Sequence, residues 1–443
     1  ARRPVRGERT MSGGRMRQFR NLGAAVTVAT LFAVGCAAGE ENATGEAIVV
    51  FGPYRDAEAD RLVESFEEYA ENAGVVIRYT GSNDFVTDLH RRIGSADAPD
   101  IALIPQPGLV AQLVDDGSIF QLDEATARQL VENYEPDVLA VAEFDGVDYA
   151  VPFRRTMKSV VWFRRDVFET EGWVLPTSLD ELEALSATIA TSERGIAPWC
   201  FAMSAGDATG WAATDWVEDL VVRRQGPEFY DAWTAGTVEF ADPAIEEAFV
   251  EFRDLVLQPG RVAGGIVDVV STRVERAWEP LLKSDPGCAM YRQADFAIGW
   301  MPNGTDAGPE ESLDWFVLPG VAGDAPPLVI GGDEIVQFDN RPEVNGLMAF
   351  LASSRAGTPW ARSGGFLSAK SSISEDEYPD VEKGFITALA TSPVQVFDAS
   401  DQMRPDIGSG LLWTEITKWV GGSISYGRFA ETIDAAQRQE ALT

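Results

Sequence analysis

The sequence is poor in the side chains that bind metals or assist nucleophiles. It holds one histidine, His90, and three cysteines, Cys36, Cys200 and Cys288, in 443 residues. It contains neither a CxxC pair nor an HExxH motif, so we expect no zinc or haem site and no cofactor. A histidine-based catalytic triad would depend on His90 alone. Its neighbours form an amphipathic helical pattern, which favours a surface or interface histidine instead.

Basic residues are also scarce relative to acidic ones. Lysine and arginine together number 36 against 70 aspartates and glutamates, which gives a net charge of −34 at pH 7. Such a surface repels polyanions, so the composition argues against binding to nucleic acid and against polybasic attachment to anionic lipid. The apolar fraction of 45% is nevertheless that of a globular protein.

The N-terminal hydrophobic run is too short for a typical transmembrane helix. This run, Leu22–Gly35, has about fourteen residues and follows two arginines. The pattern predicts an export signal over residues 1–35, with translation starting at Met11 or Met16.

A cysteine follows this signal directly. The residues before Cys36 are small, so the stretch resembles a bacterial lipobox, with Ala33 in place of the usual leucine. The prediction is a lipidated Cys36, a polar linker over 36–46 and a chain held at the outer face of the cell membrane; an ordinary signal peptide is the alternative. Two cysteines, Cys200 and Cys288, then remain in an oxidising compartment, which invites a disulfide between them.

The length exceeds the size at which a single hydrophobic core stops growing, so at least two lobes are expected. The first part of the chain alternates predicted strands at 47–51, 75–79 and 101–104 with predicted helices, which indicates a parallel βαβ series. Ligands bind at the carboxyl edge of such sheets. The candidate ligand contacts after these strands are Tyr54, Glu58, Ser82, Asn83, Asp84 and Gln106.

Residues 198–219 combine three tryptophans with four acids. A sugar has an apolar C–H face that packs on an aromatic ring and a rim of hydroxyls that bond to carboxylates and amides. Trp199, Trp211 and Asp215 are therefore candidate ligand contacts. The alternatives are a tryptophan-rich core for the segment and helix N-capping for Asp215 and Asp84.

Further along, local signals predict helix starts and strands. Ser178 and Glu181 have the spacing of a capping box. Asp242 followed by proline predicts a helix over 243–257. Residues 296–300 and 334–338 are predicted as strands.

Several longer motifs occur in order along the chain. They include PQPG at 105–108, GVDYAVPFRRTMKSVVWFRRD at 146–166, PTSLDELEAL at 176–185, GGDEIV at 331–336 and SGGFLS at 363–368. Together they resemble the extracellular solute-binding proteins of carbohydrate ABC importers, the class shared with maltose-binding proteins. Within that class the chain is most similar to α-glucoside-binding members. The motifs that carry this are PQPG, GGDEIV and SGGFLS, together with PWC at 198–200, ATGWAATDWVEDLV at 208–221, GCAMYRQADF at 287–296 and FDASDQM at 397–403. Ala150 departs from the glycine usual in the motif at 146–166.

The resemblance implies an α/β fold of the type II, maltose-binding-protein-like class, with two lobes, a hinge and an interlobe cleft. By pattern, the N-terminal lobe comprises 47–154 plus 300–333, and the C-terminal lobe comprises 155–299 plus 334–443. The crossings between the lobes are expected near 154–158, 298–302 and 332–335.

The resemblance also implies a function without catalysis. It predicts a monomeric, membrane-anchored binding protein that captures an α-glucoside or similar oligosaccharide and delivers it to the permease subunits. Further ligand contacts implied in this way are Arg154, Trp300, Asp333, Gly365, Phe366 and Asp398. A binding protein for a polyamine or peptide, and a secreted glycosidase with paired carboxylates, are the alternatives.

Overall fold

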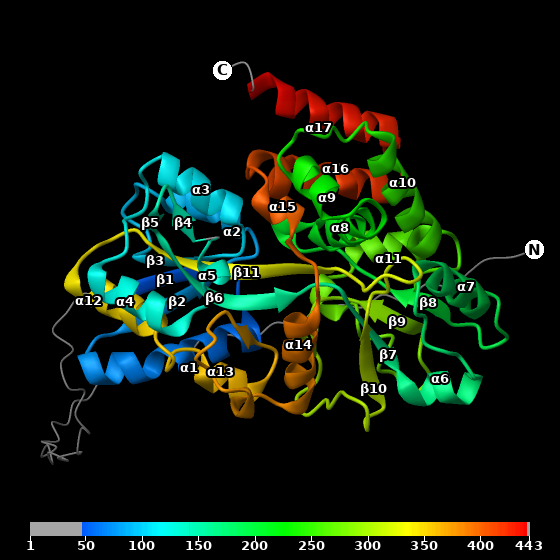
Figure 1. Ribbon diagram of the computed structural model, residues 1–443, viewed down its shortest axis with the longest axis horizontal. Coiled ribbons are helices and arrows are strands. Elements are labelled where there is room, and N and C mark those ends of the chain that lie inside the picture. The colour runs from blue at the N-terminus through cyan, green and yellow to red at the C-terminus, as the bar shows by residue number, and fades with distance from the viewer. Residues whose placement is uncertain (1–46, 141, 441–443) are drawn as a thin grey trace, which may run out of the picture. The chain divides into compact units, whose positions relative to one another are not determined.

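The computed structural model describes residues 47–140 and 142–440, and two main β-sheets flanked by helices make up this part of the chain (Figure 1). The first sheet has the strand order β12-β6-β11-β3-β1-β2, with β13 paired to β11 off this path. Its strands are β1 (Ile48–Gly52), β2 (Ile77–Gly81), β3 (Ile101–Ile104), β6 (Ala150–Met157), β11 (Leu328–Gln337), β12 (Leu367–Ser368) and β13 (Gln395–Phe397). Strand β1 is parallel to both β2 and β3, which confirms the predicted βαβ series. The predicted signal peptide, Cys36 and the linker lie outside the described residues.

Helices cover both faces of this sheet. In Figure 1, α2 and α3 lie above it, and α1, α12 and α13 lie below it. One face packs Phe85 and Leu109 of the upper helices against Phe51, and the other packs Leu62 and Phe66 of α1 under the sheet. The helices of this part are α1 (Asp56–Ala73), α2 (Phe85–Arg92), α3 (Pro107–Asp115), α4 (Glu124–Asn133), α5 (Pro136–Leu139), α12 (Pro342–Leu351), α13 (Thr358–Ser363) and α14 (Asp380–Thr391), with a small hairpin of β4 (Glu143–Phe144) and β5 (Val147–Asp148).

The second sheet has the order β10-β7-β9-β8. Its strands are β7 (Val160–Arg164), β8 (Ala197–Cys200), β9 (Cys288–Arg292) and β10 (Leu313–Val317). The helices around it are α6 (Arg165–Glu171), α7 (Leu179–Ala190), α8 (Trp211–Gln225), α9 (Pro227–Thr234), α10 (Pro243–Phe252), α11 (Gly265–Ser271), α15 (Ala399–Gln402), α16 (Trp413–Val420) and α17 (Tyr426–Glu440). The predicted disulfide is present: Cys200 at the end of β8 is bonded to Cys288 at the start of β9, with 5.4 Å between the Cα atoms.

The chain passes between the two sheets at more than one place. Strand β6 leads through Lys158 and Ser159 into β7, as expected for a crossing near 154–158. The second passage, 318–327, joins β10 to β11. The third follows β13, after which α15 packs in the core of the second lobe.

Two expected crossings and one expected strand are corrected. Residues 332–335 lie inside β11, where they pair with β6 and β3 in the first sheet. Residues 298–302 lie between β9 and β10, two strands of the second sheet. The predicted strand at 296–300 is a 3-10 helix, η4 (Asp295–Trp300), because a short apolar run has no periodicity that separates a strand from a helical turn.

The predicted helix starts are confirmed. The Ser178 hydroxyl accepts a hydrogen bond from the Glu181 amide at 3.2 Å, and Glu181 in turn accepts one from the Thr177 amide at 2.7 Å. The Asp242 carboxylate accepts from the Ala244 amide at 2.8 Å at the start of α10. The helix predicted over 243–257 continues past α10 as a π-helical segment, Arg253–Leu257.

Glu334 of β11 is a buried carboxyl group with an unpaired oxygen. It is 2% exposed, and its Oε2 has no hydrogen-bond partner. Burial, followed by repulsion from Asp333, raises the pKa of Glu334 to about 8. The folded protein therefore holds this proton more tightly than the unfolded chain does. The contribution of protonated Glu334 to the free energy of unfolding is full at pH values below the pKa of the unfolded chain, and it is lost as the pH rises through the pKa of the folded protein.

We expect this carboxyl group to lower the free energy of unfolding by about 2 kcal/mol between pH 6 and pH 7.5, at about 1.4 kcal/mol per pH unit. Glu334→Gln should flatten the pH dependence by that amount, because the amide does not titrate. Urea unfolding of the ligand-free protein at a series of pH values measures this. Glu64→Gln, a change at an exposed acid of α1, should keep the wild-type slope. A slope that Glu334→Gln leaves unchanged would contradict the assignment.

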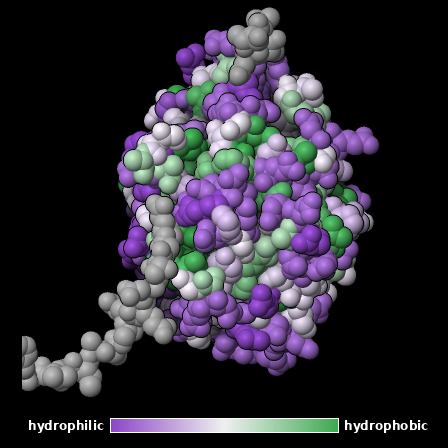
Figure 2. Space-filling view, turned by 90° about the vertical axis from the view of Figure 1, so that its left-hand side faces the viewer, coloured by the Kyte–Doolittle hydropathy of each residue, from purple (hydrophilic) through white to green (hydrophobic). Residues whose placement is uncertain are grey.

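The surface is dominated by polar residues. Figure 2 shows a face on which hydrophilic residues predominate and hydrophobic ones are interspersed among them. The more exposed large apolar side chains of the described residues include Val131 on α4, Val174 in the loop between α6 and α7, and Val267 on α11, so they lie on separate segments. Among the described residues no helix combines the length and the apolar character that crossing a bilayer requires. His90 lies exposed on α2, as predicted.

Candidate functional site

A cavity of about 420 Å³ lies where the carboxyl ends of β1, β2 and β3 face loops of the second lobe. The first lobe contributes the residues that follow these strands, and the second contributes residues around 205–211 and 273–275. Nine of the predicted contacts line this cavity: Tyr54, Glu58, Ser82, Asn83, Gln106, Arg154, Trp211, Trp300 and Asp333. The sheet edge and the tryptophan segment thus meet at one site, as the sequence predicted.

Aromatic rings form a connected wall of this cavity. The Phe296 ring lies between Trp211 and Trp300, with centroid distances of 6.2 Å and 4.9 Å. Trp413 of α16 also lines the cavity. All three rings of the connected wall are half-buried, so part of each is available to a ligand. Such a surface suits the C–H face of a sugar ring.

Arg154 organises one polar side of the cavity. It is 4% exposed, and its guanidinium donates to Glu58 Oε1 at 3.2 Å and to the Gly365 carbonyl at 2.8 Å. The Trp300 indole N–H donates to the other oxygen of Glu58 at 3.1 Å. Burial alone would lower the pKa of Arg154, but Tyr54, Glu58 and Asp333 raise it above its usual value, so the guanidinium stays charged.

Asp333 and Gln106 present acceptors to the cavity. The Tyr54 hydroxyl donates to Asp333 Oδ2, and burial, more than the opposing effect of Arg154, raises the pKa of Asp333. Gln106 is 7% exposed, and its Oε1 has no partner. A buried amide oxygen without a partner is costly unless a ligand donates to it. These groups can accept hydrogen bonds from the hydroxyls of a polar ligand.

Lys158 organises the opposite side, where β6 leads into β7. Its ammonium group donates to Asp398, to Asp401 Oδ2 at 3.2 Å and to Asp215 Oδ1 at 3.3 Å. Burial lowers the pKa of Lys158, but the negative charges around it, first those of Asp215 and Asp398, reverse this and hold it well above the usual value. Burial and repulsion from Asp398 raise the pKa of Asp401 to about 8, so that carboxyl keeps a proton near neutral pH. Lys158 therefore remains charged, and it joins the start of β7 to α8 and α15 beside the cavity.

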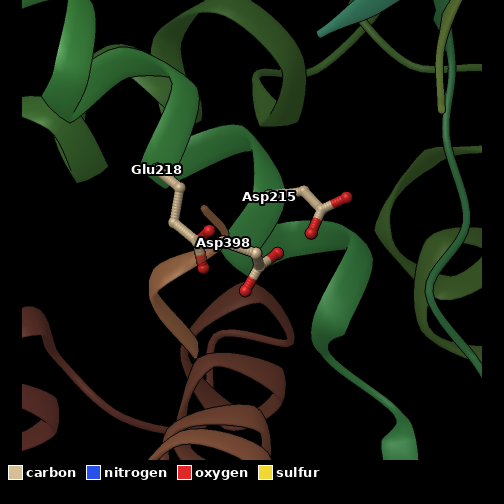
Figure 3. A group of neighbouring side chains, drawn as sticks. All are labelled: Asp215, Glu218 and Asp398. Carbon is tan, nitrogen blue, oxygen red and sulfur yellow. The ribbon is translucent and has the colours of Figure 1, made fainter. Parts of the chain in front are cut away.

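Figure 3 shows Asp215 and Glu218 of α8 converging with Asp398 at the start of α15. Their carboxylates approach closely enough to hold a metal ion. However, cationic side chains already compensate this group: Lys158 bonds to Asp215 and Asp398, and Arg292 bonds to Asp215 at 3.0 Å. Glu218 accepts from two amides at the start of α15. We therefore assign it a structural role rather than a metal site.

The rim of the cavity carries contacts between the lobes. Asp84 Oδ1 accepts from the Asp207 amide at 3.1 Å, and Asp207 Oδ2 accepts from the Thr87 amide at 3.3 Å. Arg55 and Glu275 form an ion pair at 3.5 Å nearby. Asp84 is at the N-cap position of α2 but makes no cap hydrogen bond, so it contacts the other lobe instead of capping its own helix.

The remaining predicted contacts do not line the cavity. Trp199 and Phe366 are fully buried in core clusters, because each sits among apolar neighbours of its own lobe. Asp215 and Asp398 lie behind the wall on Lys158, with Asp215 inside α8 rather than at its start. The backbone of Gly365 holds Arg154.

Several lining residues were not predicted. They are Lys158, Asp207, Arg273, Glu275, Phe296, Asp401 and Trp413, among others. Only Lys158 had a usable signal, because a lone lysine between two apolar strand segments indicates a paired, buried cation.

Two α/β lobes joined by several chain crossings, with one cavity walled by both, define a binding protein that holds a solute between its lobes. Residues 53–357 match the bacterial extracellular solute-binding protein family, and the chain belongs to this family.

Two relatives match over most of both chains. The osmoprotective compounds-binding protein GgtB of Synechocystis sp. is 32% identical over 85% of this chain and 89% of its own. The alpha-glucosides-binding periplasmic protein AglE of Rhizobium meliloti is 32% identical over 86% of this chain and 85% of its own.

Solved structures agree on the fold. A chitin oligosaccharide binding protein superposes with a TM-score of 0.75 at 18% identity, over 89% of this chain and 98% of its own. Maltose-bound MalE3 of T. maritima gives a TM-score of 0.68 at 16% identity, over 88% and 99%. The predicted type II, maltose-binding-protein-like fold is thus confirmed. The protein is an extracellular solute-binding component of an ABC importer and not an enzyme.

Proposed function

We propose that the protein captures a short α-glucoside, about the size of a disaccharide, and delivers it to the permease. The main supporting observation is that the aromatic wall of Trp211, Phe296 and Trp300 lines the same cavity as the acceptors Glu58 and Asp333. The volume of about 420 Å³ is near the lower end for ligand pockets, which favours a short sugar over a long oligosaccharide. The name of the relative AglE supports the α-glucoside class.

The contacts divide into two roles in this proposal. Trp211 stacks on a sugar ring, and Glu58, Asp333 and Gln106 accept from its hydroxyls; Ser82 and Asn83 contact it from the rim. Asp84, Arg154, Asp215, Gly365 and Asp398 position those groups.

The proposal extends to the chain's anchoring and lobes. We propose that Cys36 is lipidated, that the protein acts as a monomer at the outer face of the membrane, and that the chain crosses between the lobes at 158–159, at 318–327 and directly after β13. These limits replace the predicted cuts at 154/155, 299/300 and 333/334. They are supported by the pairing of all of β11 within the first sheet and by the packing of α12 and α13 against α1.

The test is a titration of the soluble form starting at Ala37, followed by tryptophan fluorescence. The panel comprises sucrose, maltose, trehalose and malto-oligosaccharides of increasing length. Saturation by a disaccharide, with weaker binding of the longest sugars and no release of glucose, supports the proposal. Saturation only by a peptide or polyamine that enters this cavity overturns the substrate, and release of glucose overturns the binding-only function.

Trp211→Ala is expected to weaken binding of the best sugar roughly tenfold, because the stacking surface is lost. Isothermal titration calorimetry measures this without relying on the removed fluorophore. Trp173→Phe is the matched control, since Trp173 packs on Phe168 away from the cavity. Equal affinities of the Trp211→Ala and wild-type proteins would remove Trp211 from the site.

A further inference from the structure

A second cavity, of about 800 Å³, lies beside the first. Its walls are the loop 301–311, the start of β10, the turn after α13 and the first half of α14, with Arg61 of α1. The two cavities share Gly299, Met301 and Asn303 at the end of η4, where Gly299 also packs on Gly365. The rest of their linings differ.

The charge of this cavity is strongly one-sided. Six acids line it: Asp306, Glu310, Glu311, Asp314, Asp380 and Glu382. Arg61 is the lining cation, and its guanidinium donates to the Gly364 carbonyl at 3.2 Å. Asp314 and Asp380 are paired with Arg165 and Lys383. The acids of the 301–311 loop have no ion pair among those found in the described residues.

An unpaired oxygen of Glu382 gives independent support for a ligand in this cavity. It is 1% exposed, and its Oε1 accepts from the Gly365 amide at 2.7 Å. Its Oε2 is buried and has no hydrogen-bond partner in the described structure. An unpaired carboxylate oxygen in the wall of a cavity is a costly feature unless a ligand donates to it.

The lining favours an extended organic cation over a metal ion. Within residues 47–140 and 142–440, the acids that converge closely enough to bind a metal are Asp215, Glu218 and Asp398, none of which lines this cavity. The acids here are spread along the walls. Trp315, half-buried on Phe385, adds an aromatic surface that attracts ammonium groups and packs against methylenes.

We propose that this second cavity binds a linear polyamine, with one ammonium group on Glu382, others along the acidic loop 301–311, and the methylene chain against Trp315. Glu382, Trp315 and the acids of the loop do not line the sugar cavity, so we expect the two ligands to bind at the same time.

The test uses spermidine and isothermal titration calorimetry at 0.15 M salt, with and without a saturating sugar. At this ionic strength, attraction to exposed acids alone is largely screened. We expect one spermidine per chain, equal binding in both conditions, and at least a tenfold loss of affinity in Glu382→Gln. Glutamine still accepts from Gly365, so the variant removes the charge while keeping that turn. Glu71→Gln, at an exposed acid of α1, should change the affinity less than twofold.

Different outcomes overturn the proposal. Equal losses in both variants would show non-specific attraction to an acidic surface, and displacement of spermidine by sugar would place it in the first cavity. Binding of Ca²⁺ in place of spermidine, lost in Glu382→Gln, would assign a metal site. If the protein binds sugar normally but spermidine binding does not saturate at millimolar concentration, the polyamine site is contradicted and the proposed sugar binding is not. Trp315→Phe gives a second reading, since it should weaken spermidine binding while preserving the packing on Phe385.

Discussion

Lys158→Met is expected to lower the free energy of unfolding by about 3–5 kcal/mol, because it leaves buried carboxylates without their cation. Lys158 bonds to Asp398, Asp401 and Asp215, and the first and last of these are fully buried. Methionine fills a similar volume but cannot neutralise them. Urea unfolding of the ligand-free protein measures the loss.

Two further variants isolate the cause. Lys383→Met removes a surface lysine that pairs with the exposed Asp380 three residues away, and it should cost less than about 1 kcal/mol. Combining Lys158→Met with Asp398→Asn should recover at least about 1 kcal/mol, because one uncompensated charge is then gone. If the double variant is no more stable than Lys158→Met alone, the loss does not arise from the unpaired carboxylate.

Gly108→Ala is expected to weaken sugar binding on the order of a hundredfold, since it blocks the approach of the two lobes. Gly108 is the second residue of α3, in the first lobe. A β-carbon there would lie 2.1 Å from the Met403 carbonyl oxygen and 2.8 Å from that of Gln402, at the end of α15 in the second lobe. Both obstacles are backbone, so no side-chain rotation relieves them, and the lobes must stay apart.

The same variant should leave each lobe folded, because alanine is a better helix former than glycine. Thermal unfolding of the ligand-free protein checks this, and calorimetry with the best sugar gives the affinity. Gly427→Ala in α17 is the matched control, since a β-carbon there meets no atom within 4 Å. Wild-type affinity in Gly108→Ala would show that sugar binding does not need this contact.

The first half of the fold was readable from sequence because its signals are local. Buried strands alternate with amphipathic helices there, and the residues after β1, β2 and β3 necessarily gather at one sheet edge. The antiparallel insertion of β11 between β3 and β6 could not be read in this way. It joins residues more than 170 positions apart, and no local pattern records such a pairing.

The candidate site, too, could be predicted from the sequence only in part. Trp211 and Trp199 are equally apolar, yet one lines the cavity and the other is buried against Trp216, with ring centroids 4.9 Å apart. Helix α8 is buried on nearly all sides, so Asp215 has no polar face to mark it as either a cap or a contact. Composition identified a segment that lines the cavity, but tertiary packing decides which of its side chains face that cavity.

The disulfide between Cys200 and Cys288 closes a covalent ring of the chain that contains both second-lobe loops of the cavity, 205–211 and 273–275. The two loops are therefore tethered to neighbouring strands, whatever the lobes do relative to each other. The second-lobe side of the cavity is therefore preorganised, so its two loops do not have to become ordered when a solute binds. The conformational cost of binding a solute then falls on the crossings between the sheets. Reduction of the disulfide should weaken binding, because the two loops would then have to be ordered as well.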